Sequence, residues 1–204
     1  MKIICVGRNY VAHAAELGND VPDAPMLFMK PATALLIEDR PLYYPDFTKD
    51  LHYEGELVLR IAKNGRSVQP EFADSYFDEI GFGIDFTARD LQEQCKKKGH
   101  PWEIAKAWDH SAAISRTWIR KEELPDIASV QFSLDLNGKN VQQGDSALMI
   151  FSFRDIIAYA SRFFKLQTGD LIFTGTPAGV GPVTPGDRLT GYVEGRKMLE
   201  CEIR

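Results

Sequence analysis

The sequence has few of the features that mark disulfide-rich, zinc-binding or membrane-spanning proteins. Its three cysteines, Cys5, Cys95 and Cys201, fit neither a disulfide framework nor the spacing of a zinc site. Its apolar runs all fall short of the ~18 residues that a membrane-spanning helix needs. The apolar part of the first eight residues is too short for a signal peptide. We therefore expect a cytoplasmic protein with reduced thiols.

Positive charge is outnumbered by negative charge and forms no long stripe. The net charge is −5, from 24 lysines and arginines against 29 acidic residues, which argues against nucleic acid or an anionic membrane as a partner. The main basic cluster, Lys96 to Lys98, precedes Gly99 and is typical of a capped, solvated helix end. With 44% hydrophobic residues, the chain can bury one sizeable core, and we expect a single domain over residues 1–204.

Hydrophobic alternation and turn signals predict a mainly β fold with a few helices (α+β), of the sandwich or rolled-barrel kind. Asn64-Gly65 and Asn137-Gly138 are two-residue hairpin signals. Three helices are expected, and Ser152 and Asp155 form a capping box at the start of the last of them. The predicted helices are 11–17, 88–98 and 153–166, and the main predicted strands are 3–6, 54–62, 80–87, 130–136, 171–174, 189–193 and 198–203.

Two glutamates in one predicted strand are the strongest chemical signal. Glu54 and Glu56 point to the same face, and at ~3.3 Å rise per residue their Cα atoms lie roughly 6.6 Å apart. Gly55 between them leaves room for another group to approach closely. Like charges on one sheet face raise each other's pKa, and a divalent metal compensates them. With Asp85 further along the chain, three carboxylates suffice as protein ligands for Mg²⁺ or Mn²⁺.

A histidine and further polar groups accompany these carboxylates. His13 and Glu16 lie three residues apart in a predicted helix and share a face, which suits a general base acting on water. We expect Glu16 to favour the protonated form of His13. Lys30 and Lys106 sit in apolar surroundings, where a lysine near a metal holds a carboxylate or stabilises negative charge.

The loop from Thr174 to Pro182 is dense in glycine and proline. Its backbone N–H groups and the Thr176 hydroxyl can cradle a carboxylate, although no phosphate-loop lysine follows. Taken singly, each of these motifs is also typical of a solvated helix end, a solvated strand face or a tight turn. Their joint occurrence is what carries the functional argument.

The order of these motifs along the chain resembles a known family. It runs from Gly7-Arg8-Asn9-Tyr10, His13 and Glu16 through Lys30-Pro31, Glu54-x-Glu56, Asp85 and Thr87-Ala88-Arg89-Asp90 to Lys96-Lys97-Lys98-Gly99, Pro101-Trp102, Lys106 and the Gly175–Gly181 loop. This set resembles the fumarylacetoacetate hydrolase family in its short single-domain form. The likeness spans roughly residues 3 to 203. It is nearest to the branch of acylpyruvases, fumarylpyruvate hydrolases and oxaloacetate decarboxylases.

The resemblance implies properties that the composition does not. It implies the family's mixed β-sandwich roll, a homodimer, and Mg²⁺ or Mn²⁺ as cofactor. It implies metal ligation by Glu54, Glu56 and Asp85, catalytic roles for His13, Glu16 and Lys106, and substrate contacts by Arg8, Lys30, Arg89, Gln92 and Thr176. The chain departs from the family pattern at Trp108 and Ala113, where relatives often carry phenylalanine and proline, and we expect the bulkier Trp108 to reshape the pocket wall.

The implied activity is metal-dependent hydrolysis of the C–C bond of a 2,4-dioxo acid, such as acetylpyruvate or fumarylpyruvate. Decarboxylation of oxaloacetate and isomerisation or decarboxylation of an unsaturated 2-oxo dioate use related chemistry and stay open. A non-catalytic module that binds a metal and an anion is a rival from another class, but it needs no helical His–Glu pair. A cupin-type metalloenzyme needs clustered histidines, and those of this chain are dispersed at His13, His52, His100 and His110.

Overall fold

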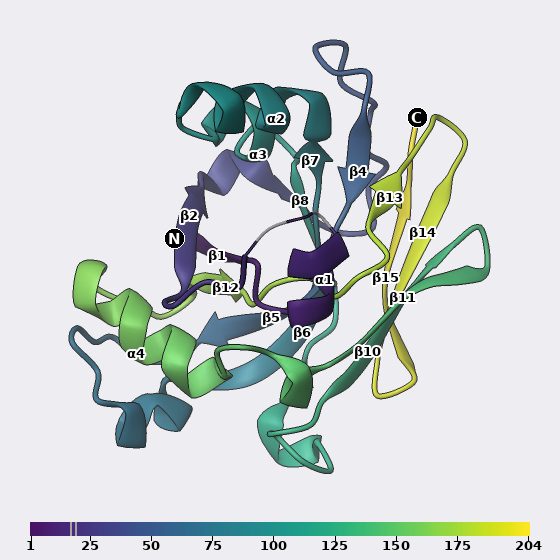
Figure 1. The fold of residues 1–204 in the computed structure, drawn as a ribbon. Helices are drawn as coiled ribbons and strands as arrows, with labels where there is room; N and C mark the ends of the chain where they lie inside the picture. Colours follow the sequence, from purple (N-terminus) through teal and green to yellow (C-terminus); the bar gives the residue numbers. More distant parts are fainter. Residues whose placement is uncertain (17, 19) are drawn as a thin grey trace.

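Strands dominate the computed structural model, which describes residues 1–16, 18 and 20–204. Its largest sheet has the order β2-β1-β12-β5-β6-β8-β3, with β9 paired to β6 (Figure 1). These strands are β1 (Ile3–Gly7), β2 (Met26–Lys30), β3 (Leu35–Leu36), β5 (Gly55–Ile61), β6 (Phe77–Asp85), β8 (Ala112–Ile114), β9 (Ile119–Arg120) and β12 (Leu171–Phe173).

Two smaller sheets complete the β structure. One has the order β11-β10-β14-β15, and the other has the order β13-β4-β7. Their strands are β4 (Leu51–Tyr53), β7 (Thr87–Ala88), β10 (Gln131–Leu136), β11 (Lys139–Asp145), β13 (Gly181–Pro182), β14 (Arg188–Val193) and β15 (Arg196–Glu202). The expected mainly β fold with a few helices, in the form of a sandwich roll, is confirmed.

The large sheet curls until its two edges come close together. Strands β2 and β3 stand at opposite ends of the strand order, yet only residues 31–34 separate them in the chain. A link of this length spans at most about 18 Å, so the sheet cannot be flat. The curl brings the end of β2 toward the ends of β6 and β8, and this decides what surrounds the functional site.

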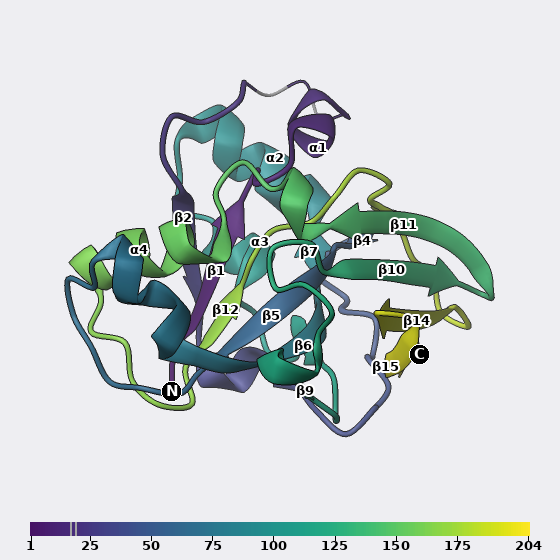
Figure 2. The ribbon, with the colours of Figure 1, turned by 90° about the horizontal axis from the view of Figure 1, so that it is seen from below.

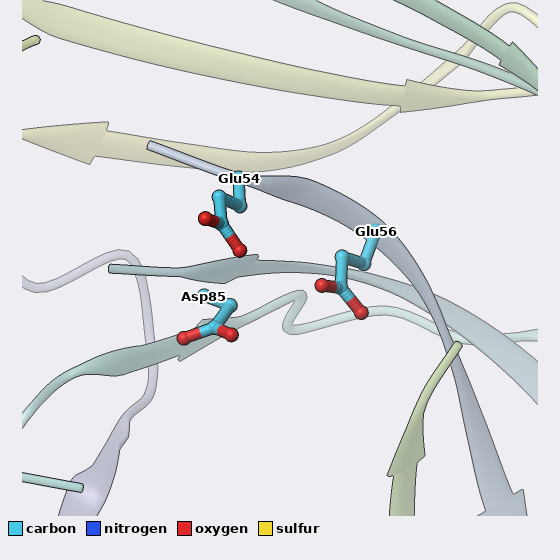
Figure 3. Close-up of side chains that lie close together, drawn as sticks. All are labelled: Glu54, Glu56 and Asp85. Carbon is cyan, nitrogen blue, oxygen red and sulfur yellow. The ribbon is translucent and has the colours of Figure 1, made fainter. Parts of the chain in front are cut away.

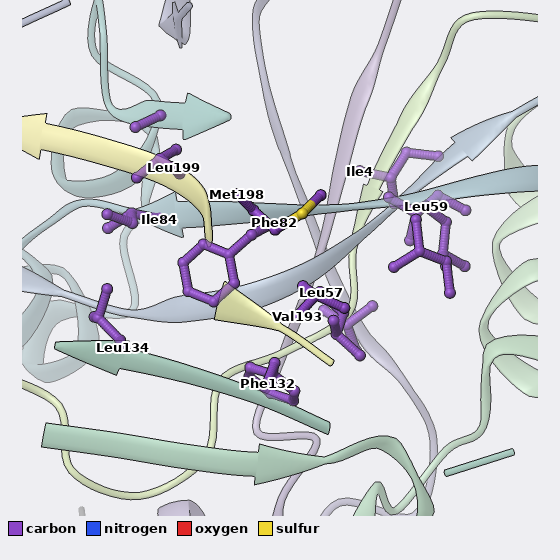
Figure 4. Packing of buried hydrophobic residues seen from close by; sticks show 14 of the residues in the cluster. Ile4, Leu57, Leu59, Phe82, Ile84, Phe132, Leu134, Val193, Met198 and Leu199 are labelled. Carbon is purple, nitrogen blue, oxygen red and sulfur yellow. The ribbon is translucent and has the colours of Figure 1, made fainter. Parts of the chain in front are cut away.

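The main core lies between the curled sheet and the β10-β11-β14-β15 sheet. Figure 2 shows the latter sheet beside β5 and β6, on the side away from α4 (Phe153–Phe163). Phe82 lies at the centre of this core, with its ring centroid 6.3 Å from that of Phe132 (Figure 4). A Cβ atom at residue 191 would come within 2.2 Å of the Phe82 ring, so the close approach of β14 requires Gly191.

The helices are short and lie at the margins of the sheets. They are α1 (Val11–Glu16), α2 (Arg89–Lys98), α3 (Glu103–Lys106) and α4, and no described helix is long and apolar enough to cross a membrane. The capping box of Ser152 and Asp155 is confirmed. However, α4 ends at Phe163 instead of residue 166, because Phe164 is extended and Leu166 pairs with Gly65. Phe163, the last residue of α4, is 55% exposed.

One of the two predicted hairpin turns is confirmed. Asn137 and Gly138 have φ angles of 52° and 79° and join β10 to β11 in a tight hairpin. The turn predicted at Asn64-Gly65 is wrong, because β5 and β6 are joined by residues 62–76, which include the 3₁₀ helix η2 (Pro70–Tyr76). Gly65 serves close packing instead, since a Cβ atom there would come within 2.2 Å of the Tyr76 ring.

Candidate metal centre and active site

The register of β5 and β6 brings three carboxylates together. Gly55 lies opposite Ile84, and the Asp85 backbone N–H donates to the Glu54 carbonyl at 2.8 Å, so Glu54 and Asp85 face each other. Glu54, Glu56 and Asp85 are only 6%, 2% and 1% exposed. One carboxylate oxygen from each residue lies within 4.8 Å of the others, and Figure 3 shows the three groups converging. The predicted clustering of these three side chains is therefore present.

Three cations neutralise part of this cluster. Lys106 Nζ donates to Glu54 Oε2 at 2.7 Å and to Asp85 Oδ2 at 2.8 Å, and Arg89 donates to Glu54 Oε1 at 2.7 Å. Lys30 Nζ lies 2.8 Å from Asp85 Oδ1. Burial raises the pKa of Glu54, but Lys106 and Arg89 outweigh this effect and hold it well below its usual range. Burial lowers the pKa of Lys106, but the negative charges of Asp85 and Glu54 outweigh this effect and raise the pKa above its usual value.

Glu56 is the least compensated of the three carboxylates. Its Oε2 accepts a hydrogen bond from the Gly175 backbone N–H at 2.7 Å, and no cation pairs with it among the described residues. Burial, followed by the negative charges of Asp85 and Glu54, raises the pKa of Glu56 well above its usual value. The protein thus holds a carboxylate that resists ionisation, at a point where its neighbours already carry negative charge.

A divalent cation fits this arrangement. Carboxylate oxygens are the ligands that Mg²⁺ and Mn²⁺ prefer, and the spacing of the three groups allows one ion to contact all of them. Asp85 Oδ1 is buried and accepts no well-directed hydrogen bond from the described residues, although the Lys30 ammonium is near it. An ion bound here would relieve the repulsion that burdens Glu56.

The carboxylates form the floor of a cavity that gathers most of the predicted site residues. Its wall has an apolar part and a polar part. The apolar part comprises Val6, Met26, Phe28 and Trp102. The polar part comprises the predicted residues Arg8, His13, Arg89, Gln92, Lys106 and Thr176, together with Lys96.

His13 faces this cavity from α1, and Glu16 lies beside it on the same helix. His13 is buried, its Nδ1 lies 3.3 Å from Glu16 Oε2, and Glu16 Oε1 accepts from the Gly179 backbone N–H at 3.0 Å. Burial lowers the pKa of His13 and outweighs the opposing effects of Glu54 and Glu16. Glu16 thus favours the protonated form, as expected, but burial has the larger effect, and the neutral imidazole is the form that can accept a proton.

The glycine-rich loop binds a carboxylate that belongs to the protein itself. Its Gly175 N–H is used by Glu56, and the Thr176 hydroxyl donates to the Gly55 carbonyl at 2.9 Å. Gln142, which the sequence analysis did not single out, donates to the Thr176 hydroxyl at 2.8 Å and accepts from the Gly55 N–H at 2.9 Å. The buried Gln142 amide therefore fixes the loop to Gly55, the first residue of β5, which lies between the two glutamates.

Lys30 lies behind the carboxylates instead of on the cavity wall. Its side chain is fully buried, and besides Asp85 it donates to Ser111 Oγ at 3.0 Å and to the Lys106 carbonyl. This corrects the expected substrate contact, because the curl of the sheet carries the end of β2 to the rear of the site. Trp108 is also absent from the wall, since its ring packs on Phe47 at a centroid distance of 5.6 Å, so the expected reshaping of the wall is wrong.

Replacing Lys30 by methionine is expected to lower the free energy of unfolding by about 3–5 kcal/mol, because it leaves Asp85 buried with less compensating charge. Urea unfolding of the metal-free protein measures this. Lys97→Met is the matched control: its side chain is 79% exposed, and its change should stay within about 0.5 kcal/mol. Equal stability of the two variants would contradict the structural role of Lys30.

Comparison with known proteins identifies relatives along the whole chain. The sequence profile described as Fumarylacetoacetate (FAA) hydrolase C-terminal matches residues 2–204. A curated relative, oxaloacetate tautomerase FAHD1, mitochondrial, from Bos taurus, is 42% identical over 201 residues, which cover 98% of this chain and 90% of the relative.

Solved structures agree with this result. The fumarylpyruvate hydrolase from Pseudomonas aeruginosa, in complex with Mn²⁺ and pyruvate, is 39% identical with a TM-score of 0.94, over 100% of this chain and 89% of that one. The 2-hydroxyhepta-2,4-diene-1,7-dioate isomerase from Mycobacterium marinum is 33% identical with a TM-score of 0.85, over 99% of this chain and 73% of that one.

Proposed function

Because this chain belongs to the fumarylacetoacetate hydrolase family, an enzyme family with hydrolase, tautomerase and isomerase members, we propose that it is a metal-dependent acylpyruvate hydrolase. It would cleave a 2,4-dioxo acid to pyruvate and a carboxylic acid. The observation that carries this proposal is the buried His13 on the wall of the cavity that also contains the carboxylate cluster, with its Nδ1 3.3 Å from Glu16 Oε2. Of the reactions considered, hydrolysis depends most strongly on a base that activates water.

Glu54, Glu56 and Asp85 would hold the ion. Bound Mg²⁺ or Mn²⁺ supplies Lewis-acid polarisation of the 1-carboxylate and 2-oxo group of the substrate. The solved Pseudomonas aeruginosa relative, which is in complex with Mn²⁺ and pyruvate, supports a divalent ion as cofactor and pyruvate as product. The proposal takes Mg²⁺ or Mn²⁺ as the ion that the protein uses in the cell.

The protein's own groups account for the proton transfers. Neutral His13 takes a proton from water, and the resulting hydroxide attacks C4 of the substrate. The C3–C4 bond then breaks, its electrons pass to C3 of the leaving pyruvate, and C3 takes up the proton that His13 removed from water, which restores the neutral imidazole. Glu16, held by Gly179, fixes the imidazole ring. The Lys106 ammonium on the cavity wall stabilises the negative charge that develops on pyruvate.

Substrate binding is assigned to the other polar groups on the wall. The Arg89 guanidinium donates to Gln92 Oε1 at 2.7 Å, which leaves the Gln92 amide N–H groups free to donate to a bound acid. Thr176 and Arg8 face the same space. We assign no substrate contact to Lys30.

A second candidate is oxaloacetate tautomerisation, which the 42% identity to the Bos taurus enzyme favours. It needs only proton transfer at C3 and no attacking water. Decarboxylation of oxaloacetate and isomerisation of an unsaturated 2-oxo dioate are related reactions of the same family.

One assay separates these candidates. Loss of acetylpyruvate enol absorbance and keto–enol conversion of oxaloacetate are measured in parallel, with Mg²⁺, with Mn²⁺ and with chelator. Metal-dependent loss of acetylpyruvate, with pyruvate released, supports the hydrolase. Accelerated conversion of oxaloacetate alone supports the tautomerase, and turnover of neither substrate would favour a longer unsaturated 2-oxo dioate or the non-catalytic binding module.

The proposal includes a homodimer, which rests on the family likeness. It also places the protein in the cytoplasm, which is consistent with its three buried, unpaired cysteines. Light scattering across a range of protein concentrations is expected to give twice the 23.0 kDa mass of the chain. A monomeric mass at every concentration would contradict the dimer.

A further inference from the structure

The buried side chain of Gln142 joins segments that carry the site, although it lies outside the cavity wall. It belongs to β11, in one of the smaller sheets, and is only 2% exposed. Its Oε1 accepts from the Gly55 N–H at 2.9 Å, and its NH₂ group donates to the Thr176 hydroxyl at 2.8 Å and to the Pro177 carbonyl at 3.0 Å. All three partners belong to β5 or to the loop that follows β12.

The chemistry of these partners fixes the direction of each hydrogen bond. A backbone N–H only donates and a carbonyl only accepts, so the Gln142 oxygen must face Gly55 and its NH₂ group must face Pro177. The Thr176 hydroxyl accepts from this NH₂ group and donates its own hydrogen to the Gly55 carbonyl at 2.9 Å. The ladder between β12 and β5 covers Val58 to Arg60, so this closed ring of hydrogen bonds takes its place at Gly55.

The loop that Gln142 holds supplies one backbone donor to each half of the proposed active site. The Gly175 N–H donates to Glu56 Oε2 at 2.7 Å, and the Gly179 N–H donates to Glu16 Oε1 at 3.0 Å. The loop residues bonded to Gln142 lie between these two donors in the chain. One buried side chain therefore fixes the segment that links a carboxylate of the cluster to the partner of His13.

Close packing of Gly179 on β11 gives the loop a second point of attachment to the same strand. Gly179 has a φ angle of 99°, and a Cβ atom there would come within 2.2 Å of the carbonyl oxygen of Val141, the residue before Gln142. A larger residue would push the loop off β11 and move the N–H that Glu16 uses. The placement of Glu16 relative to Glu56 is thus set by β11, from outside the cavity.

We propose that Gln142 is a positioning residue, which sets the place of the general base relative to the bound substrate by holding the loop over residues 174–179. This inference rests on the proposed function, because it takes His13 as the base and Glu16 as the group that orients it. Gln142 acts through the loop and does not contact the substrate. Catalysis is sensitive to such a device, since a displacement of about 1 Å can lower the rate by about 10²-fold.

Kinetics of Gln142→Met measure this role. Methionine has a similar length but none of the three hydrogen bonds, so kcat for acetylpyruvate hydrolysis should fall by about 10- to 10²-fold. KM and the Mn²⁺ affinity should stay close to those of the wild type, because the carboxylates keep their places on β5 and β6. In a Glu16→Ala background the same change should cost little more, since Gln142 acts through Glu16. The matched control is Gln143→Met, at the exposed next residue of the strand, which should leave kcat unchanged.

Hydrogen exchange, followed by NMR on the Mg²⁺-loaded protein, measures the same role without turnover. In the wild type, the side-chain amide protons of Gln142 should exchange far more slowly than those of exposed Gln143. In Gln142→Met, the Gly175 and Gly179 N–H groups should exchange about tenfold faster or more, because the loop opens locally. The N–H of Ile61, which donates to the Asp170 carbonyl at 2.9 Å at the far end of β5, should keep its rate.

A second variant keeps the test decisive if Gln142→Met does not fold. Gln142→Glu keeps the size and the acceptor for Gly55 but loses the NH₂ group that holds the loop, so it should also speed exchange at Gly179 and lower kcat. Unchanged exchange and kcat in the folded variant, or a fall in kcat matched by an equal loss of Mn²⁺ affinity, would overturn the proposal. So would equally fast exchange of the Gln142 and Gln143 side chains in the wild type.

The two measurements also separate this inference from the proposed function. Faster exchange at Gly175 and Gly179 in the variant, in a protein that hydrolyses neither acetylpyruvate nor fumarylpyruvate, would support the hold of Gln142 on the loop and count against the hydrolase. Hydrolysis by the wild type that Gln142→Met leaves undiminished would support the hydrolase and overturn the positioning role.

Discussion

Glu56→Gln is expected to reduce metal-dependent turnover by about 10³-fold or more, because it removes the charge of a metal ligand.

The same change should stabilise the metal-free protein. Burial and the negative charges of Asp85 and Glu54 raise the pKa of Glu56 in the folded protein. As the pH rises above about 4.3, the usual pKa of a glutamate, the unfolded chain therefore releases a proton that the folded chain retains. Stability at this position is present at low pH and lost as pH rises through the folded pKa. The glutamine avoids this loss and still accepts from Gly175.

Glu54→Gln is the matched control with the opposite sign. Glu54 is paired with Lys106 and Arg89, so its neutralisation leaves buried cations with less compensating charge and should cost about 3–5 kcal/mol. Urea unfolding in chelator measures both variants, and Mn²⁺ calorimetry should show weakened binding in each. Equal destabilisation of the two variants would contradict the charge distribution described for the site.

His13→Ala is expected to lower hydrolysis by about 10²- to 10⁴-fold, the usual contribution of a general base. Mn²⁺ affinity should stay close to that of the wild type, because His13 is not one of the three clustered carboxylates. Oxaloacetate decarboxylation should tolerate the change better, since it needs no attacking water. Exposed His100→Ala serves as the control.

The pH dependence of the wild type follows from the same residue. The base must be neutral, so hydrolysis should fall on the acid side as pH drops through the lowered pKa of His13, below the usual value of about 6.5. The kcat/KM profile of His13→Ala should lack this acid limb. Undiminished hydrolysis by His13→Ala would reject His13 and Glu16 as the pair that activates water.

Local patterns were enough to predict the elements that carry the site. The alternation around Glu54 and Glu56 predicts β5, and the capping box of Ser152 and Asp155 predicts the start of α4, because both depend on neighbours in the sequence. The prediction of a turn at Asn64-Gly65 is wrong because it considered only the sequence neighbours of these residues. The position of Gly65 is decided by its packing on Tyr76 and its pairing with Leu166, which no local pattern reveals.

The supporting residues of the site were harder to find from the sequence. The hairpin signal at Asn137-Gly138 predicts a strand after it, but nothing local marks Gln142 as buried between Gly55 and Thr176. The family resemblance assigned Lys30 to substrate binding. Its actual position behind Asp85 depends on the curl of the whole sheet, which a local pattern does not reveal. Lys96 was taken as part of a solvated helix end, although the i, i+3, i+7 spacing with Arg89 and Gln92 would have placed it on their face.

The most direct test of the account is anomalous diffraction from a crystal of this protein grown with Mn²⁺ and pyruvate. We expect a manganese peak within about 2.0–2.3 Å of oxygens from Glu54, Glu56 and Asp85, with pyruvate beside it in the cavity that His13 lines. A protein that turns over its substrate only with metal, yet places the manganese away from these three carboxylates, would contradict the account.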